Sequence, residues 1–371
     1  MTGLGAGDLV ITSYGLLQQD SAAFAACHWH SVVLDEAQAI KNAQTKRSQA
    51  VMALQAGFRV VATGTPLENH LGELWNLFRF INPGLLGSQD HFNSRFAAPI
   101  EQGDTAARRA LKALIQPFIL RRLKSQVLDE LPARTEITYK VPLSDEEAHL
   151  YEALRQQAVN NVSDLAPGAG RSFQILTEIT RLRRFCCHPA LVTPGSTLPG
   201  SKFLAGTALI AELLDNGHKA LIFSQYVDHL SIVRTWLEQK GIAFHYLDGS
   251  VPAKERESRV NAFQAGAGEV FLISLKAGGS GLNLTAADYV IHLDPWWNPA
   301  VEDQASDRAY RIGQQRPVTV YRLVAENTIE EQIVALHARK RDLADSLLEG
   351  GEVSAKLDAD ALLALLAGSL G

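Results

Sequence analysis

Cysteine is scarce in this sequence: Cys27, Cys186 and Cys187 are the only three among 371 residues. Three cysteines are too few for a disulfide framework, so we expect a reducing compartment. Cys186, Cys187 and His188 are adjacent in sequence, whereas zinc ligands are spaced apart and usually number four. We therefore interpret these cysteines as small buried thiols and not as metal ligands.

Long apolar runs and a strong net charge are also absent. No stretch of 18 apolar residues occurs, so we expect no membrane-spanning helix and no membrane partner. The net charge is −5, which argues against a uniformly basic, histone-like surface but leaves room for a basic cleft. An apolar fraction of 46% over 371 residues is ordinary for a globular protein and suffices for two or three domains with cores.

The sequence also lacks a recognisable phosphate-binding loop. Such a loop reads G-x-x-x-x-G-K-[ST], yet none of the 12 lysines follows a glycine. Lys202 follows Ser201 in a linker-like stretch, and the early run GLGAG has neither a lysine nor a hydroxyl at the required place.

What the sequence does contain is an alternation of apolar, β-rich runs with amphipathic helical stretches, which predicts parallel sheets covered by helices. Early in the chain we expect strands at residues 8–14, 31–36 and 58–65, with a helix at 45–56. Later strands are expected at 219–224, 244–249, 269–274, 289–294 and 318–324.

The middle of the chain is predicted to be helical. Residues 111–132 are interpreted as helical as far as Pro132, and Ser144 with Glu147 forms a capping box that begins another helix. Residues 193–201 are rich in Pro, Gly and Ser, which is typical of a linker. A second capping box, Thr328 with Glu331, begins a C-terminal helix.

The predicted fold is therefore α/β, with two parallel-sheet units and a helical region between them. We place the first unit at residues 1–83 and the helical region with its linker at 84–200. The second unit is placed at 201–325 and a C-terminal helical extension at 326–371.

Two adjacent carboxylates end the apolar run SVVLDEAQAIKN, which covers residues 31–42. Ligands of parallel sheets bind at the carboxyl ends of strands, where Asp35 can hold Mg²⁺ and Glu36 can orient an attacking water. An acidic pair that begins a helix and faces its dipole is the structural alternative. In the next strand, VATGTPLEN places Thr63 where it could sense a γ-phosphate, although a plain strand-to-helix turn would look the same.

A second set of candidate residues lies late in the chain. The run SLKAGGSGLNL brings Gly278, Gly279 and Gly281 together after a strand, which is typical of a backbone anion site or of a flexible loop. In QASDRAYRIGQQR, Arg308 and Arg311 are predicted to share one helix face, with Gln304 one turn before. Paired arginines can stabilise charge on a phosphoryl group, and a solvated basic helix face is the alternative.

In their order and wording these motifs resemble the Swi/Snf-like ATPases of helicase superfamily 2. The resemblance covers nearly all of residues 8–350. It rests on DEAQAIKN, TGTPLEN…ELWNLFRFINPGLLG, ILRRLKSQVLDELP, FSQYVDHL, YLDGSVPAKERE, SLKAGGSGLNLTAADYVIHLDPWWNPAVEDQASDRAYRIGQ and RPVTVYRLVAENTIEEQI.

The resemblance implies two RecA-like lobes that close on ATP and Mg²⁺ and translocate on double-stranded DNA. By motif, Asp35 would hold the metal, Glu36 would orient water, and Arg308 and Arg311 would complete the site. The remaining residues that it implicates are Thr63, Gly279, Gly281 and Gln304 for ATP, and Asn69, Ser224, Gln225, Lys276 and Trp297 for DNA. DNA is expected to be held through its phosphates, with weak sequence preference.

The motifs that the family carries ahead of DLVITSYG, including the phosphate loop, are not in this sequence. We therefore expect a truncated first lobe with an uncovered apolar face, and little or no ATP hydrolysis by this chain alone. A non-hydrolysing adaptor for DNA or protein is the alternative. A strand-separating helicase is a third possibility, but the motifs DPWWNP and RIGQ fit it less well.

The composition bears on where the protein acts. Arginine outnumbers lysine by 23 to 12 and alanine is abundant, which hints at a GC-rich bacterial genome. We accordingly expect a cytoplasmic, nucleoid-associated protein whose partners include RNA polymerase or other DNA-bound proteins.

Overall fold

The computed structural model describes residues 3–64, 71–122, 124, 130–163, 169–278, 281–337, 363 and 366. The chain forms two compact units that divide between Arg121 and Arg122. The predicted boundary at residue 83 therefore falls inside the first unit, and the one at 200 falls inside the second. Within the described ranges, no helix has both the length and the apolar character needed to cross a bilayer.

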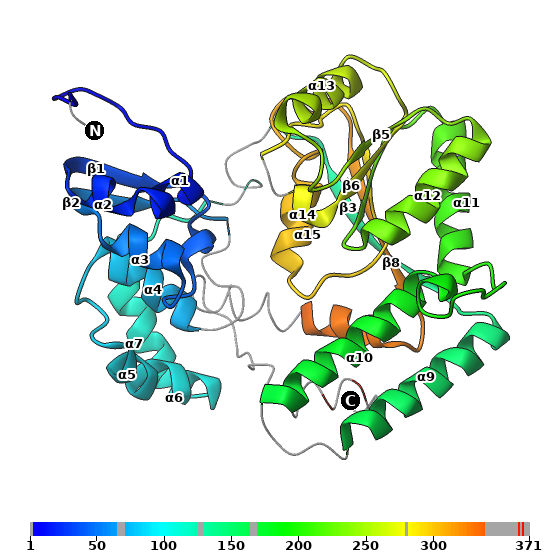
Figure 1. The fold of residues 1–371 in the computed structure, drawn as a ribbon, viewed down its shortest axis with the longest axis horizontal. Helices are drawn as coiled ribbons and strands as arrows, with labels where there is room; N and C mark the ends of the chain where they lie inside the picture. Colours follow the sequence, from blue (N-terminus) through cyan, green and yellow to red (C-terminus); the bar gives the residue numbers. More distant parts are fainter. Residues whose placement is uncertain are drawn as a thin grey trace. The chain divides into compact units, whose positions relative to one another are not determined.

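The first unit is built around two parallel strands, β1 (His28–Leu34) and β2 (Gln55–Val61). The connection between them contains the 3-10 helix η1 (Ala37–Ile40) and α3 (Lys46–Met52). Thr45 caps α3, since its side chain accepts from the amide of Ser48. Apolar side chains from β1, α3 and their neighbours form one core with α1 (Tyr14–Gln19), α2 (Ser21–Ala25) and α4 (Leu71–Ile81). Figure 1 shows how these helices are arranged around β1 and β2.

The predicted strand at residues 8–14 is wrong. Residues 9–13 carry no regular structure and α1 begins at Tyr14, while Leu9 and Ile11 are 83% and 87% exposed. A strand needs a hydrogen-bonded neighbour, and none of the described residues pairs with this segment. Val33 of β1 and Phe58 of β2 are more than half exposed, and the truncation of the first lobe stays a prediction.

Short helices follow α4 and pack against it in a separate apolar cluster. They are α5 (Gln89–Phe92), the π-helical turn η2 (Asn93–Ala97), α6 (Ala98–Glu101), α7 (Thr105–Ile115) and the 3-10 turn η3 (Gln116–Phe118). The predicted helix over 111–132 is wrong in its extent, since α7 ends at Ile115. Pro117 has no N–H with which to donate the next helical hydrogen bond. Gln116 keeps helical dihedral angles, φ −52° and ψ −39°, and residues 119–122 carry no regular structure.

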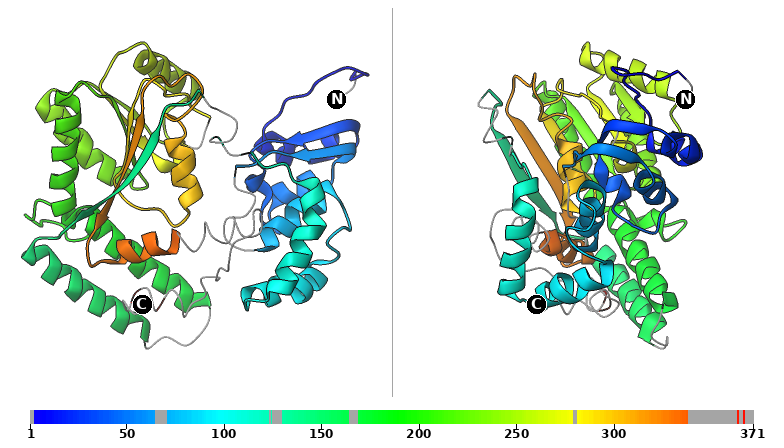
Figure 2. Two further views of the ribbon diagram at one scale, coloured as in Figure 1. Left: turned by 180° about the vertical axis from the view of Figure 1, so that it is seen from behind. Right: turned by 90° about the vertical axis from the view of Figure 1, so that its left-hand side faces the viewer.

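The second unit contains a six-stranded parallel sheet in the order β3-β8-β7-β4-β6-β5 (Figure 2). The five predicted strands are confirmed as β4 (Ala220–Ser224), β5 (Phe244–Leu247), β6 (Val270–Ser274), β7 (Tyr289–His292) and β8 (Val318–Ala325). The edge strand β3 (Arg134–Val141) was not predicted. It lies in the segment predicted to be helical and pairs with β8 over its whole length.

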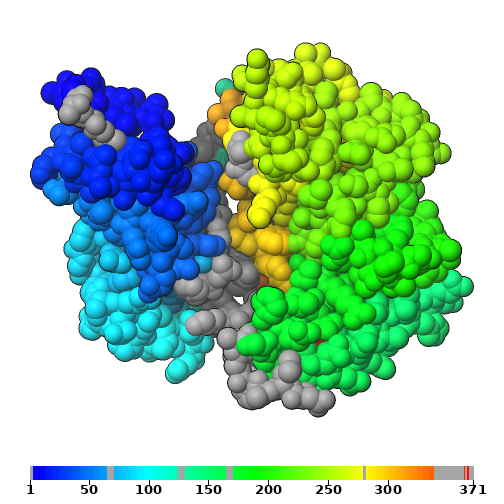
Figure 3. Space-filling model, viewed as in Figure 1, coloured from blue at the N-terminus to red at the C-terminus, as the bar shows by residue number. Residues whose placement is uncertain are grey.

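Helices cover both faces of this sheet. Alternate residues of β4 point to opposite faces, so Leu221 and Phe223 pack in one apolar cluster while Ile222 packs in another. The Ile222 face is covered by α11 (Ser201–Asp215) and α12 (Val227–Lys240). The other face is covered by α13 (Ala253–Gln264), α14 (Leu275–Gly278) and α15 (Pro299–Ser306). In Figure 3, residues 200–265, green to yellow, form a continuous surface on the viewed side of this unit.

A helical pair supports the sheet at one end. The long helices α9 (Asp145–Ser163) and α10 (Ala169–Cys187) pack against helical residues 329–337, and the 3-10 turn η4 (Pro189–Leu191) follows α10. The predicted cap at Ser144 is present, because its hydroxyl accepts from the Glu147 amide. The Glu147 carboxylate instead accepts from the Ser201 amide, so it joins the start of α9 to the start of α11.

Candidate functional site

The acidic pair lies at the carboxyl end of β1, as predicted. The Glu36 amide donates to Asp35 Oδ1 at 2.9 Å, and the Tyr14 hydroxyl donates to the Asp35 carbonyl at 2.8 Å. Glu36 has φ +48°, a left-handed conformation that residues other than glycine seldom adopt. Burial, followed by the charge of Asp35, raises the pKa of Tyr14 to about 12. This turn is therefore held in a conformation that costs free energy, which is common at functional sites.

A hydrogen-bonded bridge connects the ends of the two strands. Gln38 donates through Nε2 to Glu36 Oε2 at 2.7 Å, and its Oε1 accepts from the Thr63 hydroxyl at 2.8 Å. Thr63 follows β2, so any displacement at one strand end is transmitted to the other through Gln38. The sequence analysis did not single out Gln38, although it stands two residues after Glu36 in the quoted motif.

The loop after the acidic pair is anchored from behind by α4. Asn76 is fully buried, and its Nδ2 donates to the Ile40 carbonyl at 2.6 Å and to the Ser48 hydroxyl at 2.8 Å. Asp35, by contrast, is exposed. An exposed carboxylate on an anchored loop fits the oxygen ligation that Mg²⁺ prefers.

The glycine-rich candidate segment follows β6 in the second unit. Gly278 ends the short helix α14, and Gly281 has φ +58°. A Cβ atom on Gly278 would lie 2.9 Å from Cε1 of Phe223, so only glycine fits there without displacement. Gly279 lies outside the described residues.

Arg308 and Arg311 do not share a helix face, which corrects the prediction. Helix α15 ends at Ser306, and residues 307–313 form successive turns. The Ser306 hydroxyl is bonded to the ring Nε2 of buried His292 at 2.9 Å. After Ser306 the amide bonds no longer keep one spacing: Asp307 and Tyr310 donate to carbonyls four residues back, Arg308 and Ala309 three back and Arg311 two back. This irregular winding replaces the helix on which the spacing argument depended.

The turns nevertheless bring both arginines against the glycine segment. Arg308 Nε donates to the Gly278 carbonyl at 3.0 Å, and Arg311 Nη1 lies 3.4 Å from the carbonyl of Gly281 and 3.3 Å from that of Leu282. Arg308 is 6% exposed, whereas Arg311 is exposed. Gln304 lies in α15 and is half-buried. The glycine segment and the two arginines therefore meet within the second unit.

Replacing Gly278 by alanine tests this packing. We expect a loss of about 1–3 kcal/mol in the free energy of unfolding, because the new methyl group overlaps Phe223 and must displace the carbonyl that holds Arg308. Thermal unfolding measures the change. Gly249→Ala is the matched control, since its Cβ would meet nothing within 4 Å. Equal losses of stability from the two substitutions would contradict the close approach of Gly278 to Phe223.

The residues predicted to contact DNA differ in exposure. Lys276 is exposed on α14, whereas Ser224 is 1% exposed and donates its hydroxyl to Asp294. The backbone amide of Gln225 donates to Asp294 Oδ2 at 3.1 Å, and the Gln225 side chain is half-buried. Asn69 lies outside the described residues. The contacts of these residues with DNA stay predictions, and for Ser224 the hydroxyl is already engaged.

A buried arginine that the sequence analysis missed holds the DPWWNP segment. The guanidinium carbon of Arg183 lies 5.2 Å from the ring centre of Trp297, 5.6 Å from that of Trp296 and 5.8 Å from that of Tyr226. Its Nη2 donates to the Pro295 carbonyl at 2.5 Å, and the residue is 2% exposed. Helix α10 thus fixes the half-buried Trp297, the last of the predicted DNA residues.

Comparison with known families divides the chain into two matched regions. Residues 2–191 match the SNF2-related domain, and residues 205–313 match the helicase conserved C-terminal domain.

Individual relatives agree with these matches. YwqA of Bacillus subtilis (strain 168), which carries the name of an ATP-dependent helicase/translocase, is 41% identical over 354 residues, which are 92% of this chain and 38% of YwqA. The SWI/SNF-related matrix-associated actin-dependent regulator of chromatin subfamily A member 1 of Mus musculus is 35% identical over 362 residues, covering 94% of this chain and 34% of its own length. The chain thus spans little more than a third of the length of these relatives.

Among solved structures, the Sulfolobus solfataricus SWI2/SNF2 ATPase core in complex with double-stranded DNA matches with a TM-score of 0.51 and 39% sequence identity. That match covers 91% of this chain and 72% of the Sulfolobus chain. A structure of the Sulfolobus solfataricus SWI2/SNF2 ATPase core domain also matches, with a TM-score of 0.50 and 38% identity.

Proposed function

Because the chain belongs to the SNF2-related family of helicase-type ATPases, we propose that it is part of an ATP-dependent double-stranded-DNA translocase that remodels protein–DNA complexes. Asp35 and Glu36 serve nucleotide hydrolysis from the first unit, and Arg308 and Arg311 serve it from the second. The complex of the similar Sulfolobus core with double-stranded DNA supports duplex DNA as the track.

The observation that carries this proposal is the hydrogen-bonded bridge Glu36–Gln38–Thr63 at the carboxyl ends of β1 and β2. A solvated acidic pair at a helix start needs no such connection. A carboxylate that orients water needs a fixed direction, and the bridge supplies it through two side chains. Mg²⁺ bound at Asp35 would neutralise charge on the nucleotide phosphates.

ATP hydrolysis by the 371-residue chain alone is expected to be very weak or absent, because its sequence has no lysine-bearing phosphate loop. Steady-state ATPase assays with and without duplex DNA measure this, with Glu36→Gln as the control. Turnover that DNA stimulates and that Glu36→Gln abolishes would show that other groups hold the phosphates. Fusing a phosphate-loop segment from a relative to the chain should restore turnover in the wild type and not in Arg308→Ala.

Duplex DNA binding is expected to be independent of sequence and to weaken linearly with the logarithm of salt concentration. Lys276→Gln should lower the slope of that dependence by about 1, since one phosphate contact is lost. Lys254→Gln, which removes an exposed lysine of α13, should leave the slope unchanged. Fluorescence anisotropy with two unrelated labelled duplexes measures both quantities. Absence of duplex binding by the folded chain would refute a DNA-tracking role.

The same assays distinguish a translocase from the alternative, a non-hydrolysing adaptor. An adaptor would bind duplex or protein equally well after Arg308→Ala and Arg311→Ala, and would gain no turnover from the fused segment. We further propose RNA polymerase or other DNA-bound proteins as the clients, at the nucleoid in the bacterial cytoplasm. Co-purification with DNase-treated and untreated nucleoid fractions tests that placement.

A further inference from the structure

Three metal-ligating side chains that are far apart in sequence meet inside the second unit. They are Cys187 at the end of α10, His229 in the first turn of α12 and Asp294 just after β7. Their ligand atoms all lie within 4.8 Å of one another. The three residues are 0%, 2% and 3% exposed, so the cluster is closed to bulk solvent.

The imidazole of His229 is the unusual member of the cluster. Its Nδ1 is buried and has no hydrogen-bond partner among the residues that the structure describes. The nearest carboxylate atom, Asp294 Oδ1, lies 3.9 Å away, which is too far for a hydrogen bond. Two ligands of one tetrahedral zinc ion, each about 2.0 Å from it, are separated by about 3.3 Å. A shift of a few tenths of an ångström on each side would therefore bring this pair to a metal-binding distance.

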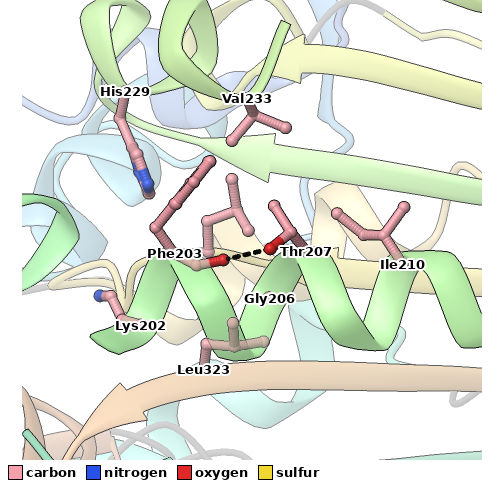
Figure 4. A pocket seen from close by; sticks show the side chains of 9 residues that line it. Lys202, Phe203, Gly206, Thr207, Ile210, His229, Val233 and Leu323 are labelled. Carbon is pink, nitrogen blue, oxygen red and sulfur yellow. Dashed lines mark hydrogen bonds between the residues drawn. The ribbon is translucent and has the colours of Figure 1, made fainter. Parts of the chain in front are cut away.

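The space beside His229 is small and partly polar. Figure 4 shows the His229 ring at the wall of a cavity between α12 and α11, together with Lys202 and Thr207. The cavity measures about 10 Å³, which is close to the room that one water molecule needs. Of the three proposed ligands, His229 lines this cavity and Cys187 and Asp294 do not. The cavity therefore gives the imidazole ring room to shift toward the other two.

Charge also favours a divalent cation here. The Asp294 carboxylate accepts from the Ser224 hydroxyl and from the Gln225 backbone amide, two donors that a negatively charged acceptor favours. Cys187 supplies a sulfur that ligates as a thiolate once a metal displaces its proton. One carboxylate and one thiolate would neutralise a doubly charged ion.

A metal-free packing of these groups is the simpler alternative. Within the part of the chain that the structure describes, it leaves His229 Nδ1 buried without a hydrogen bond, which is uncommon in folded proteins. The neighbouring Cys186 behaves as such a packing residue, because it lies in the apolar cluster formed by α9, α10 and residues 329–337. Cys187 points elsewhere, into the polar cluster, and the two adjacent cysteines therefore provide a matched pair.

We propose that Cys187 Sγ, His229 Nδ1 and the Asp294 carboxylate bind one thiophilic divalent cation of the zinc class. On binding, the Cys187 S–H bond breaks, a sulfur–metal bond forms, and the proton passes to solvent. The ion joins the end of α10, the start of α12 and the segment after β7, and so stabilises the surroundings of DPWWNP. The proposal does not depend on the proposed function.

Metal content and Co²⁺ spectroscopy of the full chain test this site. Protein expressed with added zinc should retain about one zinc ion per chain through gel filtration, as measured by mass spectrometry. Co²⁺ added to chelator-treated protein should produce visible d–d bands and a near-ultraviolet thiolate band. Proton release should accompany the titration.

Matched variants locate the ligands. Cys187→Ala and His229→Leu should lose the retained zinc and weaken or remove the cobalt bands, whereas Cys186→Ala should keep both. Circular dichroism monitors folding of each variant. The titration of the wild-type protein tests the metal site even if a variant fails to fold. A wild-type protein that retained no zinc and gave no thiolate–cobalt band at saturating Co²⁺ would overturn the proposal. Bands that persist in folded Cys187→Ala would do the same.

Discussion

Replacing Arg183 by alanine is expected to lower the free energy of unfolding of the second unit by about 3–5 kcal/mol. The guanidinium is 2% exposed, donates to the Pro295 carbonyl and lies over the rings of Trp296 and Trp297. A hydrogen bond from a charged group contributes about 1.5–3 kcal/mol, and a desolvated cation–π contact about 2 kcal/mol. Alanine removes both and leaves a cavity among the rings.

The measurement should report on the second unit alone, because a two-unit chain need not unfold in one transition. Hydrogen exchange of the amides at residues 289–297, followed across a series of denaturant concentrations, reports on the unfolding of the second unit. Thr180→Ala is the control on the same helix, because Thr180 is exposed and its hydroxyl donates only to the Leu176 carbonyl one turn before; such surface substitutions change stability by about 0.5 kcal/mol or less. If Arg183→Ala cost no more than Thr180→Ala, the arginine would not hold DPWWNP in place.

Lys202→Met is expected to cost about 3–5 kcal/mol, because it leaves the carboxylate of Glu330 buried without its counter-ion. Lys202 Nζ lies 2.5 Å from Glu330 Oε1, and the two side chains are 1% and 0% exposed. Glu330 Oε2 also accepts from the Ala325 amide at 2.9 Å. The pair therefore joins α11 to the start of the helix at 329–337, at the end of β8.

The double variant Lys202→Met/Glu330→Leu distinguishes a buried charge from lost packing. It should recover most of the lost stability, since apolar residues of similar volume often replace buried ion pairs without net cost. Lys140→Met is the exposed control, from the surface pair Lys140–Glu331, and should change little. A double variant as unstable as Lys202→Met would show that the charge is not the cause.

The pH dependence of the Lys202 effect follows from the direction of its pKa shift. Burial lowers the pKa of Lys202, but the charge of Glu330 more than compensates and the pKa is raised. The stabilisation that charged Lys202 provides is therefore complete below the pKa of lysine in the unfolded chain, about 10.4. It is lost only as pH rises through the pKa of Lys202 in the folded protein. Between pH 6 and about pH 9 the cost of Lys202→Met should stay constant, which urea unfolding at several pH values checks.

The sequence by itself determined the positions of the strands β4 to β8 along the chain and the place of the acidic pair. Runs such as ALIFS and VFLIS are apolar at every position because both faces of their sheet are covered, so they were recognisable without neighbours. The acidic pair and Thr63 were placed correctly because the carboxyl ends of neighbouring parallel strands lie at one edge. Local composition carries information of this kind.

Only the tertiary structure decided features that depend on a distant partner. Residues 8–14 have the composition of a strand but no neighbour to pair with, whereas 134–141 look unremarkable and become β3 because β8 offers a free edge. The helix before Arg308 ends where Ser306 bonds to His292. Arg183 and Lys202 are buried because aromatic rings and a carboxylate from segments 43 to 128 residues away surround them. Long-range pairing of polar groups leaves no local pattern, since each partner alone looks like an ordinary surface residue.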